Sequence, residues 1–159
     1  MRPGLRVLDL GAAPGGWAQV AANRVGPKGH VLAVDILEME PIAGVDFLQL
    51  DFLAEGADTK IREVLGGDVD LVLSDMAGNT TGHRQTDHLR IMGLAEAAYD
   101  FAVSVLLPGG SFVCKVLRGG TETELLKRIK GDFREVKHAK PPASRSDSAE
   151  MYIVAKGMK

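Results

Sequence analysis

The chain is poor in cysteine, in aromatic residues and in long apolar runs, and these shortages exclude whole classes of protein. Its single cysteine, Cys114, cannot form an intrachain disulfide, so the sequence does not encode a secreted disulfide scaffold. No apolar run reaches the roughly 18 to 20 residues of a membrane-spanning helix, and no basic and then apolar signal pattern opens the chain. We therefore expect a cytoplasmic protein with no membrane partner.

The composition fits one globular domain. The chain has 159 residues, of which 45% are hydrophobic and 25% are charged. A chain of this length can bury one sizeable core, whereas two full domains would need more residues. We expect a single domain over residues 1–159, and a monomer.

The charge is unevenly distributed, although the formal net charge is only −2. Residues 1–110 carry 8 Lys and Arg against 15 Asp and Glu, whereas residues 111–159 carry 11 against 6. A basic final third can bind a polyanion, but solvated surface charge that keeps the domain soluble is the commoner explanation. If the basic third does bind RNA, we expect the contacts at Arg118, Lys137, Lys140 and Arg145.

Short runs rich in Val, Leu and Ile alternate with longer stretches of helical period, which indicates an α/β fold with a mostly parallel sheet. The predicted strands cover residues 7–10, 30–35, 46–50, 69–74, 111–116, 135–139 and 151–155. The predicted helices cover residues 16–25, 59–65, 87–107 and 121–130. Pro108-Gly109-Gly110 should end the third helix. Because residues 140–150 show no helical period, the last two strands are predicted to form an antiparallel pair.

The sharpest local signal is VLDLGAAPGGW, in which a strand passes through Gly11 and then Pro14-Gly15-Gly16 into a helix. Glycine lets the backbone approach a ligand closely, and the first amides of a helix are free to donate to one. This segment therefore predicts a ligand-binding loop.

Two aspartates follow at the ends of the next two predicted strands. Asp35 lies 24 residues after Gly11, where nucleotide-binding α/β folds place a carboxylate on ribose hydroxyls. Asp51 precedes Phe52 in QLDF and can meet the amino edge of an adenine. Each alone could be a loop cap, but together with the glycine loop they predict a ligand that contains adenosine.

The loop matches neither a dinucleotide fingerprint nor a phosphate-binding P-loop. GxGxxG needs a glycine where Ala13 stands, and a P-loop needs Lys and then Ser or Thr where Trp17 and Ala18 stand. Hydride transfer and nucleotide hydrolysis are therefore disfavoured. S-adenosylmethionine, which contains adenosine without a pyrophosphate, is the cofactor we expect, with S-adenosylhomocysteine as its product and no metal.

Four segments together resemble one known family: GAAPGGW, SDMAGN at 74–79, SFVCKVLRG at 111–119 and SAEMYIVAKG at 148–157. They are similar to the FtsJ/RrmJ family of S-adenosylmethionine-dependent RNA 2′-O-ribose methyltransferases of the bacterial 23S rRNA type. The resemblance spans nearly the whole chain and implies the class I methyltransferase (Rossmann-like) fold. In that fold, helices cover both faces of a seven-stranded, mostly parallel sheet, and the last strand is antiparallel.

The resemblance implies methylation of a uridine ribose in large-subunit rRNA, with that RNA or the large ribosomal subunit as the partner. Two alternatives stay open. The substrate could be tRNA or an mRNA cap, or the chain could be a non-catalytic module that binds S-adenosylmethionine or RNA.

The family works with a Lys-Asp-Lys-Glu tetrad, and the resemblance places three of its members at Asp75, Lys115 and Glu150. Lys115 is the candidate general base, and the two carboxylates would orient it while favouring its ammonium form. The residues expected at the cofactor are Gly11, Pro14, Gly15, Gly16, Trp17, Asp35, Asp51, Phe52 and Asp75.

The sequence departs from the family pattern at its beginning. The family's first tetrad lysine lies upstream of the first strand, and no position before residue 7 matches it. We therefore expect a chain that lacks the family's N-terminal segment, with one lysine facing two carboxylates. Gly78 also stands where the family commonly has proline.

Overall fold

The computed structural model describes residues 3–12, 16–52, 54–75, 84–117, 122–139 and 150–159. Within these ranges, the side chains of residues 16, 84–92, 116–117, 122–123, 139 and 150–151 are outside the description. The strands are β1 (Arg6–Leu10), β2 (His30–Asp35), β3 (Val45–Gln49), β4 (Val69–Ser74), β5 (Leu106–Leu117), β6 (Phe133–Ala139) and β7 (Glu150–Met158). The helices are α1 (Gly16–Val25), α2 (Ala57–Leu65), α3 (Arg84–Val105) and α4 (Glu122–Asp132).

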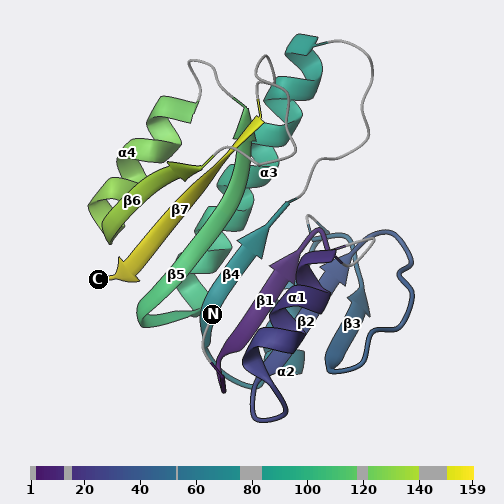
Figure 1. The fold of residues 1–159 in the computed structure, drawn as a ribbon. Helices are drawn as coiled ribbons and strands as arrows, with labels where there is room; N and C mark the ends of the chain where they lie inside the picture. The colour runs from purple at the N-terminus through teal and green to yellow at the C-terminus, as the bar shows by residue number, and fades with distance from the viewer. Residues whose placement is uncertain (1–2, 13–15, 53, 76–83, 118–121, 140–149) are drawn as a thin grey trace.

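The strands form one seven-stranded sheet in the order β3-β2-β1-β4-β5-β7-β6 (Figure 1). The first five strands pair in parallel, and β7 is antiparallel to both of its neighbours, β5 and β6. The predicted fold class and the predicted antiparallel last pair are therefore confirmed. The carboxyl ends of β1, β2, β4 and β5 meet at one edge of the sheet, where open α/β sheets bind their ligands.

Helices cover both faces of the sheet. On one face α2, α3 and α4 pack over a core that includes Leu8, Val72 and Phe112. On the other face α1 packs on a smaller core formed with β1 and β2, and Figure 1 shows it in front of these two strands. The central strands are apolar on both faces because both faces are covered, which is why their sequences are nearly continuous hydrophobic runs.

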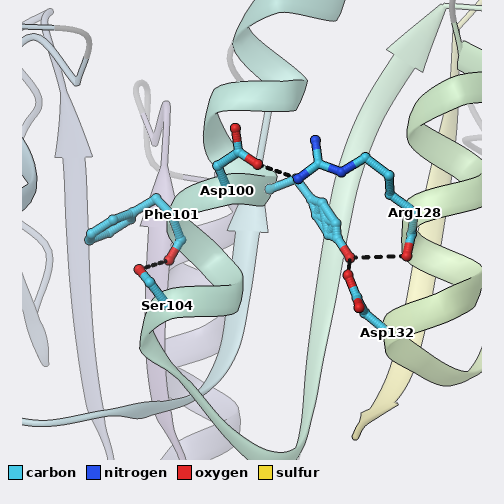
Figure 2. Close-up of polar contacts among 6 residues, drawn as sticks. Asp100, Phe101, Ser104, Arg128 and Asp132 are labelled. Atoms are coloured by element: carbon cyan, nitrogen blue, oxygen red, sulfur yellow. Dashed lines mark hydrogen bonds and ion pairs between the residues drawn. The ribbon is translucent and has the colours of Figure 1, made fainter.

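A polar cluster joins α3 to α4 at the edge of the larger core (Figure 2). The hydroxyl group of the buried Tyr99 donates to Asp132, and its oxygen lies 3.3 Å from the carbonyl oxygen of Arg128. The Arg128 guanidinium pairs with Asp100 and lies 5.0 Å from the centre of the Tyr99 ring. Burial raises the pKa of Tyr99, so this hydroxyl stays a donor at neutral pH. The cluster holds the two helices together and lies away from the carboxyl edge.

The boundary between α3 and β5 differs from the prediction. The helix ends at Val105, so residues 106 and 107 belong to the strand, and Pro108-Gly109-Gly110 lies within β5. The strand begins early because Leu106 pairs with Val69 of β4, before a register shift between Val69 and Leu71. Gly109 takes the left-handed conformation at this irregularity, with φ at 84°. The other predicted elements lie within three residues of their observed ends.

None of the helices in the described part of the chain combines the length and the apolar character needed to cross a membrane.

Candidate active site

Two of the three predicted catalytic residues meet at the carboxyl edge of the sheet. Ser74 of β4 pairs with Cys114 of β5, so the residues that follow them, Asp75 and Lys115, are neighbours. Lys115 Nζ lies 3.0 Å from Asp75 Oδ1, and the two side chains are 11% and 30% exposed. The contact is an ion pair without the alignment of a hydrogen bond. A charged amine on an otherwise apolar strand is costly to bury without such a partner.

The third predicted catalytic residue, Glu150, begins β7 opposite Leu117 of β5. The first residue of the antiparallel strand therefore returns to the carboxyl edge, as predicted. The Glu150 side chain lies outside the description, so its role in holding Lys115 stays a prediction.

The predicted adenosine-binding carboxylates lie at the ends of β2 and β3. Asp35 closes β2, and its Oδ1 accepts a hydrogen bond of 2.9 Å from the backbone of Leu37. The Leu50 amide donates to the Asp35 carbonyl at 2.8 Å, which holds the segment leading to Asp51 beside the end of β2. One oxygen of Asp35 thus stabilises its own turn. Contact of these carboxylates with a cofactor stays a prediction.

Phe52 was predicted at the cofactor, which stays a prediction, and the structure shows its ring packed against the core. The ring is half-buried and packs edge-on against Phe101 of α3, with 5.6 Å between the ring centres. This contact fixes the segment after β3 against the helical layer beneath the sheet.

The glycine loop begins as the sequence predicts. Gly11 has a φ of 75°, in the left-handed region that favours glycine, and its amide donates to the Val34 carbonyl at 2.8 Å. Helix α1 starts at Gly16, as predicted. Pro14 and Gly15, by contrast, lie outside the described residues.

Trp17, in the first turn of α1, packs on Tyr152 of β7, with ring centres 5.1 Å apart and planes at 47°. Tyr152 lies directly opposite Lys115 in the pairing of β7 with β5. The pair therefore links the start of α1 to β7, at the position that pairs with Lys115 of β5. Sequence reasoning missed Tyr152, although it stands two residues after Glu150 in the SAEMY segment.

Asp9 is the second residue that sequence reasoning missed. It lies in β1, its side chain is 1% exposed, and neither carboxylate oxygen has a hydrogen-bond partner in the described structure. Burial, and then the negative charges of Asp75 and Asp35, raise the pKa of Asp9 to about 7. The available signal was one acidic residue inside the apolar run VLDL. Strongly shifted acids of this kind cluster at functional sites.

Of the four predicted RNA contacts, the structure describes one. Lys137 of β6 is 67% exposed and forms an ion pair of 3.0 Å with Glu135. Arg118, Lys140 and Arg145 lie outside the described residues.

Lys137 shares a sheet face with two other lysines. Across the antiparallel pairs, Lys137 faces Val154, Lys156 faces Glu135 and Lys115 faces Tyr152. Side chains directly opposite each other point to the same face, and here it is the face that carries α1. Within the described residues, α1 packs mainly on β1, β2 and β3 and reaches β7 through Trp17 in its first turn, and no other helix packs on this face over β5, β7 and β6. We call this surface, with Lys115, Lys137 and Lys156, the lysine face.

Comparison with known proteins places this geometry in a family. The chain is 57% identical to "Ribosomal RNA large subunit methyltransferase E" of Parvibaculum lavamentivorans, over 100% of this chain and 66% of that protein. It is 55% identical to the protein of the same name from Xanthobacter autotrophicus, over 100% of this chain and 64% of that protein. The chain thus spans about two thirds of the length of the curated relatives it matches.

Solved structures share the fold. A crystal structure named as a ribosomal RNA methyltransferase from Plasmodium falciparum superposes with a TM-score of 0.85 at 28% identity, covering 99% of this chain and 88% of that one. A Streptococcus mutans methyltransferase solved with S-adenosylhomocysteine superposes with a TM-score of 0.62 at 12% identity, covering 99% of this chain and 89% of that one. The sheet order and these superpositions show the class I methyltransferase fold.

The family model for FtsJ-like methyltransferases matches residues 1–158, nearly the whole chain. The two relatives named above are 57% and 55% identical to the chain over 100% of its length. The chain therefore belongs to the FtsJ-like methyltransferase family.

Proposed function

We propose that the chain transfers a methyl group from S-adenosylmethionine to a ribose 2′-hydroxyl of RNA, at a uridine of 23S (large-subunit) rRNA. The observation that carries the proposal is the Lys115–Asp75 ion pair, at the sheet edge where Asp35 ends β2 and Asp51 follows β3. The names of the relatives at 55% and 57% identity support ribosomal RNA as the substrate. A ribosomal RNA substrate would put the reaction in the cytoplasm.

The described residues fit a cofactor of this kind. Asp35 and Asp51, at adjacent strand ends, suit the hydroxyls and the adenine of an adenosine. The buried Asp9 carboxylate has no hydrogen-bond partner in the described structure, which suits a ligand that carries positive charge. S-adenosylmethionine supplies a methyl group on a positively charged sulfur.

Lys115 is the group we propose to accept the proton of the 2′-hydroxyl. Its side chain is only 11% exposed, so water competes little for the hydroxyl proton. For this step the Lys115 ammonium first loses one proton to solvent, and Nζ of the neutral amine then accepts the hydroxyl proton as the ribose oxygen bonds to the methyl carbon and the carbon–sulfur bond breaks. Asp75 orients the amine through the 3.0 Å ion pair. Holding reactants in line in this way can contribute roughly 7 to 11 kcal/mol to lowering the barrier.

We propose the lysine face as the surface that receives the RNA strand. It begins at Lys115, so phosphates bound by Lys137 and Lys156 would lie on the same side of the sheet as the reacting amine. Lys137 and Lys156 are both exposed, as phosphate contacts require.

The proposal is tested by single-turnover methyl transfer with Lys115→Ala. We expect the variant to lose at least about 100-fold in rate, the usual range for a general base, while the affinity for S-adenosylmethionine stays within about threefold. Lys60→Ala is the matched control, because Lys60 is exposed on α2, on the opposite face of the sheet. Unmodified 23S rRNA, tRNA and capped RNA are compared as substrates.

Three outcomes would change the proposal. Methylation that persists in Lys115→Ala would move the base to another group. Preference for tRNA or capped RNA would replace the substrate. Cofactor binding without methylation of any of the three RNAs by the unmodified chain would favour a non-catalytic binding module.

A further inference from the structure

Asp9 is a buried carboxyl group to which the proposed reaction assigns no step. Its two oxygens accept no hydrogen bond in the described structure, and its side chain is 1% exposed. A carboxylate held in this way is unfavourable unless it takes up a proton or meets a cation. The protonation state of Asp9 should therefore change when a cation enters or leaves the site.

The charged groups around Asp9 make an ordinary internal partner hard to find. Asp35 approaches from the end of β2 and Asp75 from the end of β4, and both are negative. Lys115, on β5, is paired with Asp75. Helix α1, which covers this face, carries Arg24 as its charged residue, in its last turn and far from the carboxyl edge.

The position of Asp9 in the sheet indicates which part of a bound ligand would lie near it. β1 lies between β2 and β4, so Asp9 stands between the adenosine-binding end of the site at Asp35 and the acceptor end at Lys115. A ligand that reaches from one end to the other must cross the end of β1. In S-adenosylmethionine the sulfur lies between the adenosine and the methyl group that is transferred, so its charge falls at this crossing point.

A metal ion is a poorer candidate for that charge. Within the described residues, no three side chains of His, Cys, Asp or Glu form a group that could hold a metal ion. The cation that suits Asp9 is therefore an organic one.

We propose that Asp9 holds a proton while the site lacks a cationic ligand and releases it to solvent when a sulfonium arrives, so that Asp9 favours the methyl donor over the product with a neutral sulfur. This inference rests on the proposed function and adds to it a residue that sets cofactor specificity. Its physical consequence is that binding of the donor and loss of one proton are linked. The raised pKa of Asp9, about 7, places this linkage in the neutral range.

The test measures binding of S-adenosylmethionine and S-adenosylhomocysteine by calorimetry at pH 6, 7 and 8. For a group that titrates near pH 7 only in the free protein, we expect donor affinity to fall about tenfold between pH 8 and pH 6. Asp9→Asn should remove that dependence and reduce the preference for donor over product. The amino group of each ligand titrates in the same way with both proteins, so the difference between the proteins reports on Asp9. Asp68→Asn, at an exposed position near the opposite edge of the sheet, is the control and should behave as the unmodified chain.

A direct measurement keeps the proposal testable if Asp9→Asn folds poorly. With carbon-13 at the aspartate side-chain carboxyls, NMR should show the Asp9 carboxyl titrating near pH 7 in the free chain. It should be ionised at pH 6 with S-adenosylmethionine bound, and less so with S-adenosylhomocysteine.

Three results would overturn the inference alone: titration of Asp9 near pH 4 in the free chain, equal ionisation with both ligands, or an unchanged pH dependence of donor affinity in Asp9→Asn. Absence of any S-adenosylmethionine binding would overturn the proposed function together with this inference.

Discussion

At the scale of single residues, Asp9 shows that a site can be built against the stability of its own fold. Burial of its carboxyl, together with Asp75 and Asp35, raises its pKa from 3.8 to about 7. The folded chain therefore binds more protons at Asp9 than the unfolded chain does between these values. In this window the contribution of Asp9 to the free energy of unfolding falls as the pH rises.

We expect Asp9→Asn to change how stability depends on pH. Between pH 5 and pH 8, the free energy of unfolding of Asp9→Asn should rise relative to the unmodified chain by about 2 to 3 kcal/mol, because the variant has no proton to lose. Urea unfolding of the ligand-free proteins at the two pH values measures this difference. A constant difference between the proteins across the pH range would show that Asp9 is ionised throughout.

The sequence allowed the residues of the site to be predicted only where they lie at the ends of neighbouring strands. The family resemblance predicted that Asp75 and Lys115 act together, and they meet because they follow paired positions of the parallel strands β4 and β5. The lack of a hydrogen-bond partner for Asp9 within the described residues could not be predicted, because it depends on how elements that are distant in sequence pack around β1.

At the scale of elements, the hydrophobic runs predicted the central strands best, because each central strand is buried on both faces. The predicted start of β5 was wrong because Leu106 joins the sheet by pairing with Val69, and these residues are far apart in the chain. The apolar pattern at the end of α3 suits a helix and a strand equally well. Local sequence therefore predicts which helices and strands form more accurately than it predicts the residue at which one ends and the next begins.

The contact between α1 and β7 leads to a prediction about their energetic coupling. Trp17 and Tyr152 join the start of α1 to the strand opposite Lys115, so each should lose part of its stabilising effect when the other is replaced. In a double-mutant cycle of Trp17→Leu and Tyr152→Leu, we expect a coupling energy of about 0.5 to 1.5 kcal/mol by urea unfolding. Trp17→Leu combined with Phe133→Leu, which lies in the core on the other face, should be additive within about 0.5 kcal/mol. Additivity of both pairs would mean that the ring contact does not stabilise the fold.

At the scale of the whole molecule, the net charge of −2 conceals a separation between two surfaces. At the carboxyl edge the negative charges of Asp35 and Asp75 act on the buried Asp9, and Lys115 pairs with Asp75, which suits a cationic cofactor. The lysine face carries positive charge on the adjoining strands, which suits a polyanion. The uneven charge along the chain could be predicted from the sequence, but the gathering of lysines on one face could not, because it depends on the order β5-β7-β6.

The lysine face leads to a prediction about salt. Each phosphate contact with a single strand contributes about −0.7 to the slope of log affinity against log salt concentration. If Lys137 and Lys156 each bind one phosphate, the double variant Lys137→Glu/Lys156→Glu should bind 23S rRNA fragments with a slope shallower by about 1.4. Lys60→Glu/Lys127→Glu makes the same change in net charge on exposed positions of α2 and α4, on the opposite face, and should keep the original slope. Equal slopes for the two double variants would mean that RNA responds to the overall charge of the molecule and that the lysine face is a solvated surface.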